Sequence, residues 1–479
     1  MRIMRIVNVV PNDHSNETND DTEPNIAVNP NNPHEMVITT FTLPDAGNAN
    51  GPVFFSTDGG ENWSLRFDVP GGMPNDQTVC FASTSNELYM ATLRDSGNQL
   101  NVLRGADPST GATFPVEETR STIDQPWVQA ITVIGGPDNG KDRIYIGYND
   151  DNISKSATVD VCLDALAASP TFTQVRLETR SVGSDLRDGY AIRPVAHRDG
   201  TVYVGYQGWR SGASRSNVTM DMVVARDDNW GSGSSPFTAL TDPSDGRAGR
   251  IVAPGVVIND GGTLGGERLN NDFNIAVDPF NSDILYIVWC DNAGPNYTLR
   301  VRRSLNRGVD WSGDLITVDN ATLTCLAINI SGAVGLLYQQ LASGKWETHF
   351  RVTTDGTTWD DTLLARTATP SAGFIGDYTR MVALNDFYGV FPGMNTPDPA
   401  NFFPNGGGTF RFQRNTQGTS LVGNDGVTVI SPSLDPFFFK IRLPPYSLRR
   451  FLRVKGIDPS KGLRSIRPPL TSVRAFMGI

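Results

Sequence analysis

The chain lacks the features that mark membrane proteins, secreted proteins and helical proteins. No stretch approaches the roughly 18 consecutive apolar residues of a membrane-spanning helix, so we expect no transmembrane segment. Long helical periodicity is nearly absent before the C-terminal tail. The N-terminal stretch MRIMRIVNVVPNDHSNE has no apolar core and no small-residue cleavage site, which argues against a secretory signal. We therefore expect a cytoplasmic protein, or one exported by a route that needs no signal peptide.

Cysteine and histidine are also scarce, with four of each in the whole sequence. No Cys-x-x-Cys pair occurs, the histidines lie far apart, and most of the cysteines stand in apolar runs. Buried, reduced thiols are the expected state of such residues. A disulfide framework and a His- or Cys-based metal centre are both disfavoured, and we expect no required cofactor.

The sequence is rich instead in turn residues, with 48 Gly and 31 Pro, and in short strand-like runs between them. One self-match pairs EPNIAVNPNNPHEMVITTF, from Glu23, with DFNIAVDPFNSDILYIVWC, from Asp272. Weaker copies of the same strand–turn–strand plan begin at Gln77, Gln125, Ile192, Leu323 and Tyr378. Seven units, mostly about 50 residues apart, predict an all-β chain folded as a single propeller of four-stranded blades.

A second repeated element follows the strand pair in several of these units. Ser56-x-Asp58-x-Gly60-x-x-Trp63 is repeated as Ser304-x-Asn306-x-Gly308-x-x-Trp311, and a shortened form contains Asp355 and Trp359. The Asp or Asn side chain can accept bonds from N–H groups of its own turn, the Gly permits positive φ, and the Trp buries a large ring. We therefore interpret these boxes as structural turns.

These boxes and unit starts resemble the Asp-box, or bacterial neuraminidase repeat, propellers, the superfamily that includes sialidases. DQPWV at Asp124, FIGDYTRM at Phe374 and LDPFFFKI at Leu434 are similar to a bacterial sialidase-like branch. Sialidases have six blades, whereas this chain has seven units, so seven blades are expected and six are the alternative. The predicted organisation is a lead-in at 1–22 whose strand could close the last blade, a propeller at 23–439, and a basic tail at 440–479.

A ligand site of a propeller usually lies where the innermost strands begin. A carboxylate stands near that position in most units, and the fourth unit offers Arg193 instead; the carboxylates are Glu23, Asp76, Asp124, Asp272, Asp319 and Asp377. Three interpretations stay open: bonds to the local turns, a Ca²⁺-type cation held by residues such as Asp124, Asp272 and Asp377, or acid–base pairs acting on a neutral glycan. Glu23, Trp127, Asp272 and Asp377 are candidate ligand-binding residues. Exposed aromatics such as Trp127, Tyr190 and Trp209 could stack on sugars, but core positions are the commoner use of such residues.

A sialidase would also need an arginine cluster, a Tyr nucleophile with an activating Glu, and an Asp acid/base. The resemblance suggests Arg193, Arg268 and Arg380 for the cluster, Tyr378 and Glu267 for the second pair, and Asp124 as a further candidate catalytic residue. No complete family motif surrounds these positions, and an acidic ring would repel an anionic sugar. Authentic sialidase activity is therefore not expected.

The composition changes abruptly after residue 439. From Lys440 to Ile479 the net charge is +9, which leaves −20 for the rest of a chain whose total is −11. Three similar sequence motifs of the form small–aliphatic–Arg–x–bulky apolar recur in this tail and are separated by prolines. Their defining residues are Leu448, Arg449, Phe451, Leu463, Arg464, Ile466, Val473, Arg474 and Phe476. Repeated apolar-basic motifs favour docking onto a protein partner or larger assembly through several weak contacts, and a tail that lies across the acidic body is the alternative interpretation. The acidic body disfavours nucleic acid as a partner.

Two functions follow from the sequence. The first is a binding or scaffold propeller, with a glycan as one potential ligand, which its tail attaches to a partner. The second is a glycoside hydrolase acting at the mouth of the central channel.

Overall fold

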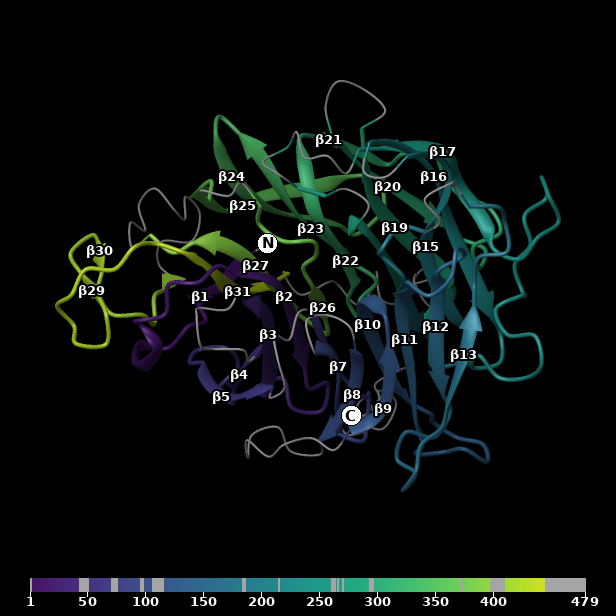
Figure 1. Ribbon diagram of the computed structural model, residues 1–479, viewed down its shortest axis with the longest axis horizontal. Coiled ribbons are helices and arrows are strands. Elements are labelled where there is room, and N and C mark those ends of the chain that lie inside the picture. The colour runs from purple at the N-terminus through teal and green to yellow at the C-terminus, as the bar shows by residue number, and fades with distance from the viewer. Residues whose placement is uncertain are drawn as a thin grey trace, which may run out of the picture.

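The computed structural model describes residues 2–42, 51–69, 76–94, 99–105, 116–182, 187–213, 216–259, 264, 267–268, 271–292, 297–370, 374–396 and 410–443. Seven sheets of four or more strands stand around a central axis and form a seven-bladed β-propeller (Figure 1). This confirms the predicted fold class and seven blades in place of six. Regular helix in the described residues is confined to the 3₁₀ turn η1 (Asn12–His14), and no helix among them is long and apolar enough to cross a membrane.

Six blades are built from consecutive strands, each antiparallel to the next. The first comprises β2 (Asp21–Val28), β3 (Met36–Thr42), β4 (Gly51–Ser56) and β5 (Ser64–Val69). The second comprises β6 (Gln77–Phe81), β7 (Leu88–Arg94), β8 (Gln99–Gly105) and β9 (Val116–Ser121). The third comprises β10 (Ile123–Thr132), β11 (Asp142–Asp150), β12 (Ala157–Cys162) and β13 (Phe172–Arg176).

The next three blades follow the same plan. The fourth comprises β14 (Arg193–Ala196), β15 (Val202–Ala213), β16 (Ser216–Asp227) and β17 (Arg250–Ile258). The fifth comprises β18 (Phe273–Asp278), β19 (Asn281–Asp291), β20 (Thr298–Ser304) and β21 (Ile316–Asp319). The sixth comprises β22 (Ala321–Ile328), β23 (Val334–Ala342), β24 (Lys345–Thr353) and β25 (Trp359–Ala368).

The seventh blade joins the two ends of the propeller. Its strand order is β26 (Met381–Ala383), β27 (Phe387–Met394), β31 (Leu434–Arg442), β1 (Arg2–Asn8) and β28 (Phe410–Arg411), and a small hairpin of β29 (Thr416–Gln417) and β30 (Ser420–Leu421) stands apart from it. The N-terminal strand β1 pairs antiparallel with β31, with Ile6 opposite Phe439 and Asn8 opposite Phe437. The N-terminal strand β1 thus covers the edge that β31 would otherwise leave free.

The blades hold together through apolar side chains packed between neighbouring sheets. In the seventh blade Phe437, Phe439 and Phe391 are fully buried and pack with Phe350 of the sixth blade. Burying large aromatic rings contributes the largest apolar areas that a side chain can offer. The four cysteines are buried and free, and none forms a disulfide.

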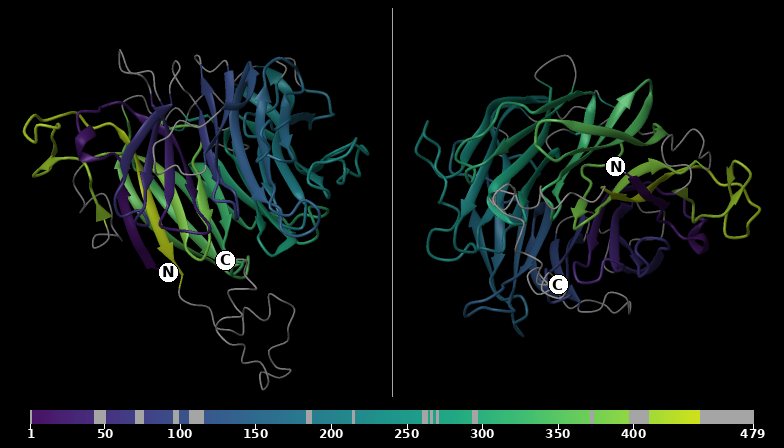
Figure 2. Two further views of the ribbon diagram at one scale, coloured as in Figure 1. Left: turned by 90° about the horizontal axis from the view of Figure 1, so that it is seen from below. Right: turned by 180° about the vertical axis from the view of Figure 1, so that it is seen from behind.

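The strand directions define two faces of the propeller. The innermost strands β2, β6, β10, β14, β18, β22 and β26 all begin at one face, here named the entry face, and end at the other, the exit face. Since β31 runs parallel to β26 through two antiparallel pairings, it ends at the exit face, and β1 begins there. Figure 2 shows the N-terminus on that side of the molecule. The tail residues that the sequence analysis singled out, from Leu448 to Phe476, lie outside the described residues. The strand β31 extends to Arg442, past the boundary expected at residue 439.

The boxes are turns between the third and fourth strands of blades one, five and six, at the exit face. In the first, the hydroxyl of Ser56 donates to Asp58 (2.9 Å), the N–H of Gly60 donates to the hydroxyl of Ser56 (3.0 Å), and the N–H of Glu61 donates to Asp58 (2.9 Å). Gly60 has φ 83°, and a Cβ there would stand 2.2 Å from the ring of Phe438, so no other residue fits. The ring of Trp63, which is buried, lies 5.3 Å from that of Phe438.

The other two boxes repeat these bonds with different residues. The N–H of Gly308 donates to Ser304 (2.9 Å), the N–H of Asp310 donates to Asn306 (2.9 Å), and Trp311 donates from its indole to the carbonyl of Gly308 (2.9 Å). In the shortened form, the N–H groups of Thr357 and Thr358 both donate to Asp355 at 2.8 Å, and Trp359 follows, half-buried, as the first residue of β25. These bonds hold each turn in place.

Candidate functional site

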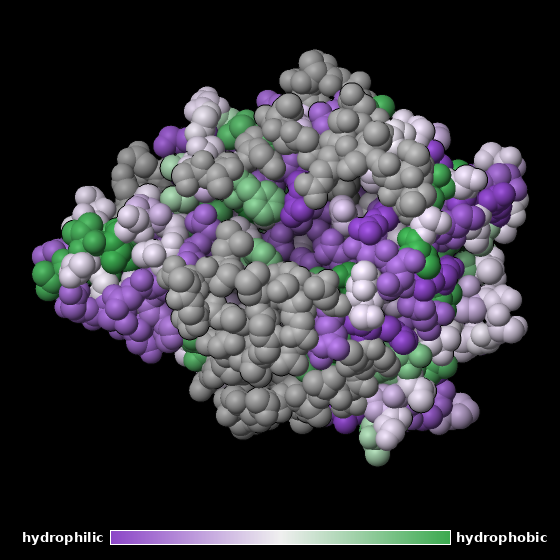
Figure 3. Space-filling view, viewed as in Figure 1, coloured by the Kyte–Doolittle hydropathy of each residue, from purple (hydrophilic) through white to green (hydrophobic). Residues whose placement is uncertain are grey.

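The charged residues predicted at the strand entries meet at the centre of the entry face. Three innermost strands begin there with a bulge whose extra residue has positive φ: Glu23 (53°), Gln125 (47°) and Leu323 (50°). Non-glycine residues with positive φ are uncommon, and such strain gathers at functional sites. In Glu23 and Gln125 the bulge carries a polar side chain to the channel mouth. Hydrophilic residues surround the hollow at the centre of the molecule in Figure 3.

Asp377 makes hydrogen bonds to several members of this group. Its carboxylate accepts bonds from Arg268 Nε (2.8 Å) and Gln125 Nε2 (3.0 Å), and its own N–H donates to Glu23 Oε1 (3.2 Å). A Cβ on the preceding Gly376, which has φ 118°, would stand 2.7 Å from the backbone nitrogen of Glu23. The close approach of these two chain segments therefore requires glycine. Burial raises the pKa of Asp377 to about 6, against the lowering effect of the Arg268 charge.

A row of three carboxyl groups crosses blades one to three beside Asp377. Asp76 shares side-chain hydrogen bonds with Glu23 and with Asp124, so it stands between them. Burial, followed by the charges of Asp377 and Asp76, raises the pKa of Glu23 well above its usual value. Burial and the charge of Asp76 do the same to the pKa of Asp124. Asp124 is half-buried whereas Glu23 and Asp76 are buried, so Asp124 is the member of the row that solvent reaches most.

Two further acids lie on the fifth-blade side of the mouth. Glu267 is buried and accepts the N–H of Ile375 (2.6 Å). Asp272 accepts the hydroxyl of Thr322 (2.5 Å) and the N–H of Thr324 (3.2 Å). Burial raises the pKa of Glu267 well above its usual value and that of Asp272 to about 7. Neutral pH therefore leaves this ring less negative than its number of carboxyl groups suggests.

The three predicted arginines are brought together, and each makes contacts within the protein. Arg268 pairs with Asp377, and Arg380 Nη1 donates to the carbonyl oxygens of Val79 (2.6 Å) and Val128 (3.3 Å). Arg193 is 2% exposed, and its Cζ lies 4.2 Å from the ring centroid of Trp127. Desolvation lowers the pKa of Arg193 to about 10. These guanidinium groups position side chains at the mouth more than they face solvent.

Tyr378 and Trp127 form a buried aromatic layer beneath the acids. Their rings meet edge to face with centroids 5.8 Å apart, and each is 4% exposed. The phenol oxygen of Tyr378 accepts the N–H of Gln77 (3.1 Å), and burial raises the pKa of that phenol well above its usual value. Trp209 is buried in the core as well, while Tyr190 is half-buried.

One predicted ring member is wrong. Asp319 is the last residue of β21, the outermost strand of the fifth blade, and is exposed. It accepts a bond from the hydroxyl of Thr298 (3.1 Å) and lies away from the channel, because the sixth blade begins only at Ala321. The sequence analysis missed Gln125 and Gly376 as site residues. The similar dipeptides Glu-Pro at residues 23–24 and Gln-Pro at residues 125–126 were the signal for the two bulges.

The predicted cation ligands Asp124, Asp272 and Asp377 each have protein partners of their own. Among the described residues, one group of three carboxylates has oxygens within 4.8 Å of one another: Glu17, Asp21 and Asp435, between the first and seventh blades. The guanidinium of Arg414, which is buried, donates to both oxygens of Asp435 at 2.8 and 3.0 Å. An arginine thus supplies the positive charge that this acidic group needs.

No protein-family model matches this sequence. No curated protein matches it either. Solved structures of propeller proteins do resemble the fold. The endosialidase of phage phi92 is 11% identical with a TM-score of 0.42, and the match covers 97% of this chain and 71% of that one. An α-L-arabinofuranosidase of Fusarium graminearum is 10% identical with a TM-score of 0.43, covering 74% of this chain and 97% of that one.

Sqt1 of Chaetomium thermophilum, bound to the N-terminus of ribosomal protein L10, is 13% identical with a TM-score of 0.43, covering 81% of this chain and 86% of that one. These likenesses extend to glycan-acting enzymes and to a protein-binding propeller alike. At such identities and TM-scores they carry no argument about ligand or reaction, which must come from the site itself.

Proposed function

We propose that this chain is a sialidase-like Asp-box propeller that binds a neutral, hydroxyl-rich ligand of the glycan class at its entry face. The observation that carries the proposal is the hydrogen-bonded row of Glu23, Asp76 and Asp124, which ends in a half-buried carboxyl at the channel mouth. A protonated carboxyl group both donates and accepts hydrogen bonds, as a sugar hydroxyl does, and the raised pKa of Glu23 and Asp124 favours that form. A charged ligand is not needed to satisfy them.

The same geometry argues against an anionic sugar as the ligand. A carboxylate ligand needs arginines with unoccupied N–H groups facing it. Here Arg268 is paired with Asp377, Arg193 is buried over Trp127 with an unpaired Nη1 that solvent does not reach, and Arg380 faces the cavity below the mouth. Tyr378, the candidate nucleophile, is 4% exposed and accepts a backbone N–H. This arrangement favours binding of a neutral glycan over sialidase chemistry.

We further propose that the tail attaches the propeller to a protein partner or larger assembly. The residues after Leu443 carry eight Lys/Arg and one Asp, against an acidic body. Because β31 ends at the exit face, the tail is joined to the propeller on the side opposite the entry face. Binding at one face and attachment at the other are therefore compatible.

The binding proposal is tested on an array of neutral and sialylated oligosaccharides, followed by calorimetry on the ligands retained. We expect neutral glycans to bind, and Asp124→Asn to weaken them at least about 10-fold through loss of a carboxyl hydrogen bond to the ligand. Asp310→Asn, on a carboxylate at the exit face that is 76% exposed, is the matched control. Retention of sialylated glycans alone, or equal behaviour of both variants, would contradict the proposal.

The attachment proposal needs a deletion that spares β31. Ile441 is fully buried and pairs with Ile3 and Phe387, so the truncation starts after Leu443 and not at residue 440. We expect the shortened chain to keep its unfolding midpoint and to lose co-purification with its partner. Unchanged co-purification would assign the interaction to the propeller.

A glycoside hydrolase is the second candidate, favoured by the raised pKa of Asp124 beside Asp76. Two titratable groups whose environments separate their pKa values are the usual acid and base of glycoside hydrolysis. In this scheme Asp124 would protonate the leaving-group oxygen with Asp76 as its hydrogen-bonded neighbour, and a carboxylate on the far side of the channel mouth would activate water, because the acid and base of such hydrolases stand at least about 5 Å apart. Turnover of chromogenic neutral glycosides that both Asp124→Asn and Asp76→Asn abolish would establish it; binding without turnover would leave the first function standing.

A further inference from the structure

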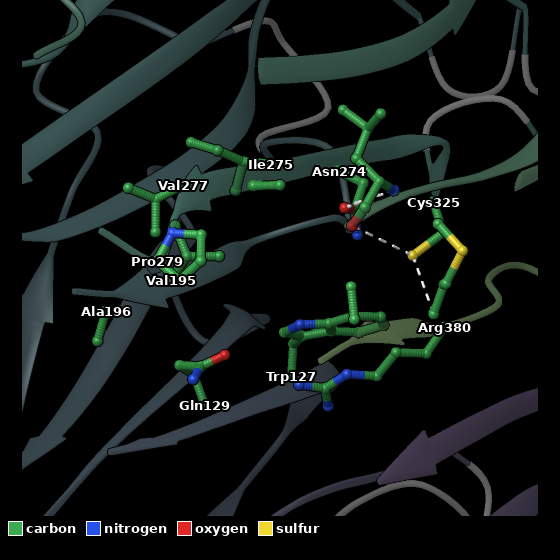
Figure 4. A pocket seen from close by; sticks show the side chains of 14 residues that line it. Trp127, Gln129, Val195, Ala196, Asn274, Ile275, Val277, Pro279, Cys325 and Arg380 are labelled. Carbon is green, nitrogen blue, oxygen red and sulfur yellow. Dashed lines mark hydrogen bonds between the residues drawn. The ribbon is translucent and has the colours of Figure 1, made fainter. Parts of the chain in front are cut away.

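A second candidate ligand site lies in the channel, on the exit side of the aromatic layer formed by Trp127 and Tyr378. A cavity of about 250 Å³ is walled by the innermost strands of blades three to seven. Its apolar wall includes Val195 of β14, Ile275 and Val277 of β18 and Leu326 of β22, and it continues to Pro279 at the exit end of β18 (Figure 4). The cavity therefore belongs to the exit half of the channel.

The cavity is separate from the carboxyl ring at the entry face. Trp127 and Arg380 line it, whereas Glu23, Asp76, Asp124 and Asp377 do not. The Cζ of Arg380 lies 5.0 Å from the ring centroid of Trp127, and Arg193 lies over the same ring. This layer of one indole and two guanidinium groups stands between the two sites.

Among the described residues, Arg380 is the one charged side chain that lines the cavity. Its Nη1 is occupied by the carbonyl oxygens of Val79 and Val128, but its Nε and Nη2 donate to no described residue. The side chain is nonetheless 93% buried, given an exposure of 7%. Neither nitrogen is among the fully buried side-chain atoms that lack a partner, so both keep surface that a ligand in the cavity could reach.

A second unused donor faces the same space. No hydrogen bond of the Trp127 indole N–H to a described residue is found, the residue is 4% exposed, and Figure 4 shows the indole ring next to the Arg380 side chain. Gln129 adds an amide that donates to the carbonyl of Ala130 (3.0 Å). One positive charge and one neutral donor, set in an apolar cavity, match one carboxylate on a compact apolar body.

We propose that this cavity binds a small organic carboxylate whose apolar part lies against Val195, Ile275 and Val277 and whose charged end meets Arg380 and Trp127. The volume accommodates a body about the size of one aromatic ring, and the single guanidinium matches a single negative charge better than a dianion. This site takes a different ligand class from the entry-face site, and neither depends on the other.

The test is calorimetric titration of the full chain with phenylacetate, and with phenylacetamide as the neutral probe of the same shape. We expect phenylacetate to bind in roughly the 0.1–1 mM range and phenylacetamide at least about 10-fold more weakly. Inorganic phosphate, with more charge and no apolar part, is expected to give no binding heat in that range.

Two variants locate the binding without touching the structural bonds of Arg380. Ala196→Leu fills the cavity and is expected to abolish phenylacetate binding, while Trp127→Phe removes the indole donor and is expected to weaken binding several-fold. Ala168→Leu, at an exposed alanine outside the channel, is the matched control. Folding of each variant is checked by its unfolding midpoint.

The outcomes separate this proposal from the entry-face function. Equal affinity for phenylacetate and phenylacetamide, or no heat from either, would overturn it and leave a cavity filled by water. Binding that survives Ala196→Leu but is lost in Asp124→Asn would place the probe at the entry face. Failure of glycans to bind, with phenylacetate binding as expected, would overturn only the function proposed for the carboxyl row.

Discussion

The aspartates of the exit-face turns and those of the entry-face ring have the same side chain but differ in burial, in hydrogen bonding and in pKa. Asp355 is exposed and accepts two backbone N–H groups, and these bonds hold its pKa well below the usual value, the bond from Thr358 having the largest effect. Asp377 is buried, and its pKa is raised to about 6 even with Arg268 beside it. Charge is stabilising at the first position and costly at the second.

This difference shows which acids can carry function. A turn aspartate is ionised at every physiological pH and has its acceptors already engaged by its own loop. Burial and neighbouring charges raise the pKa of Glu23 and Asp124 in the ring, where the backbone at Glu23 and Gln125 has positive φ. Repetition in the sequence marked the structural acids, whereas the functional candidates differ from blade to blade.

The largest effect should come from leaving a ring carboxylate without its cation. Arg268→Ala removes the partner of Asp377, which is 5% exposed, and we expect a loss of about 3 kcal/mol of unfolding free energy, because a buried charge then lacks compensation. Guanidinium-induced unfolding measures the loss.

The matched control is Arg366→Ala, whose guanidinium is 43% exposed and pairs with Glu347 near the surface. Exposed ion pairs of this kind contribute roughly 0–1 kcal/mol. Equal and small losses in both variants would mean that Asp377 simply takes up a proton, and the ring would then be less dependent on its arginine than we infer.

A backbone substitution at the ring should rank second. Gly376→Ala places a methyl group 2.7 Å from the backbone nitrogen of Glu23 at a φ of 118°, and we expect a loss of about 2 kcal/mol. Gly344→Ala is the control, since its φ is 73° but nothing lies within 4 Å of the added carbon. Thermal unfolding of the two variants separates steric clash from positive φ alone; similar midpoints would remove the argument that Glu23 and Asp377 must approach closely.

Much of the fold was predictable because blade repeats leave local marks. The alternation of apolar runs, the boxes containing Asp58, Asn306 and Asp355, and the charged strand entries are all short-range patterns, and all correspond to elements of the propeller. Seven units could be counted without knowing how they pack.

The partners within the site could not be predicted in this way. Arg268 and Asp377 are 109 residues apart, and the bulge at Gln125 decides which side chain reaches between them. Asp319 was misplaced for the same reason: a shift of a few residues moved it from the start of an innermost strand to the end of an outermost one. The register of the strands decides which side chains meet at the site, and the residues that lie near a strand in the sequence do not determine that register.

The third prediction concerns pH, and the two kinds of aspartate should respond in opposite senses. Burial raises the pKa of Asp272 to about 7, so its contribution to stability is complete below its unfolded pKa of about 4 and is lost as the pH rises through about 7. Asp272→Asn carries no titrating group, and between pH 6 and pH 8 its unfolding free energy should fall by roughly 1–2 kcal/mol less than that of the unmodified chain. Urea unfolding at a series of pH values measures this, and parallel pH profiles would show that the carboxyl is already ionised at pH 6.

The smallest effect is expected at the turn aspartate itself. Asp355→Ala leaves the N–H groups of Thr357 and Thr358 to water and removes the bond from the hydroxyl of Thr353 (3.0 Å). Since these groups lie at the surface, we expect a loss of about 1 kcal/mol. Asp355→Asn should cost close to nothing, because Asn306 already makes the equivalent bonds in the fifth blade. A large loss in Asp355→Asn, measured by the same urea unfolding at pH 7, would show that the turn depends on charge and not only on an acceptor oxygen, and the contrast between the turn and ring aspartates would then need a different physical basis.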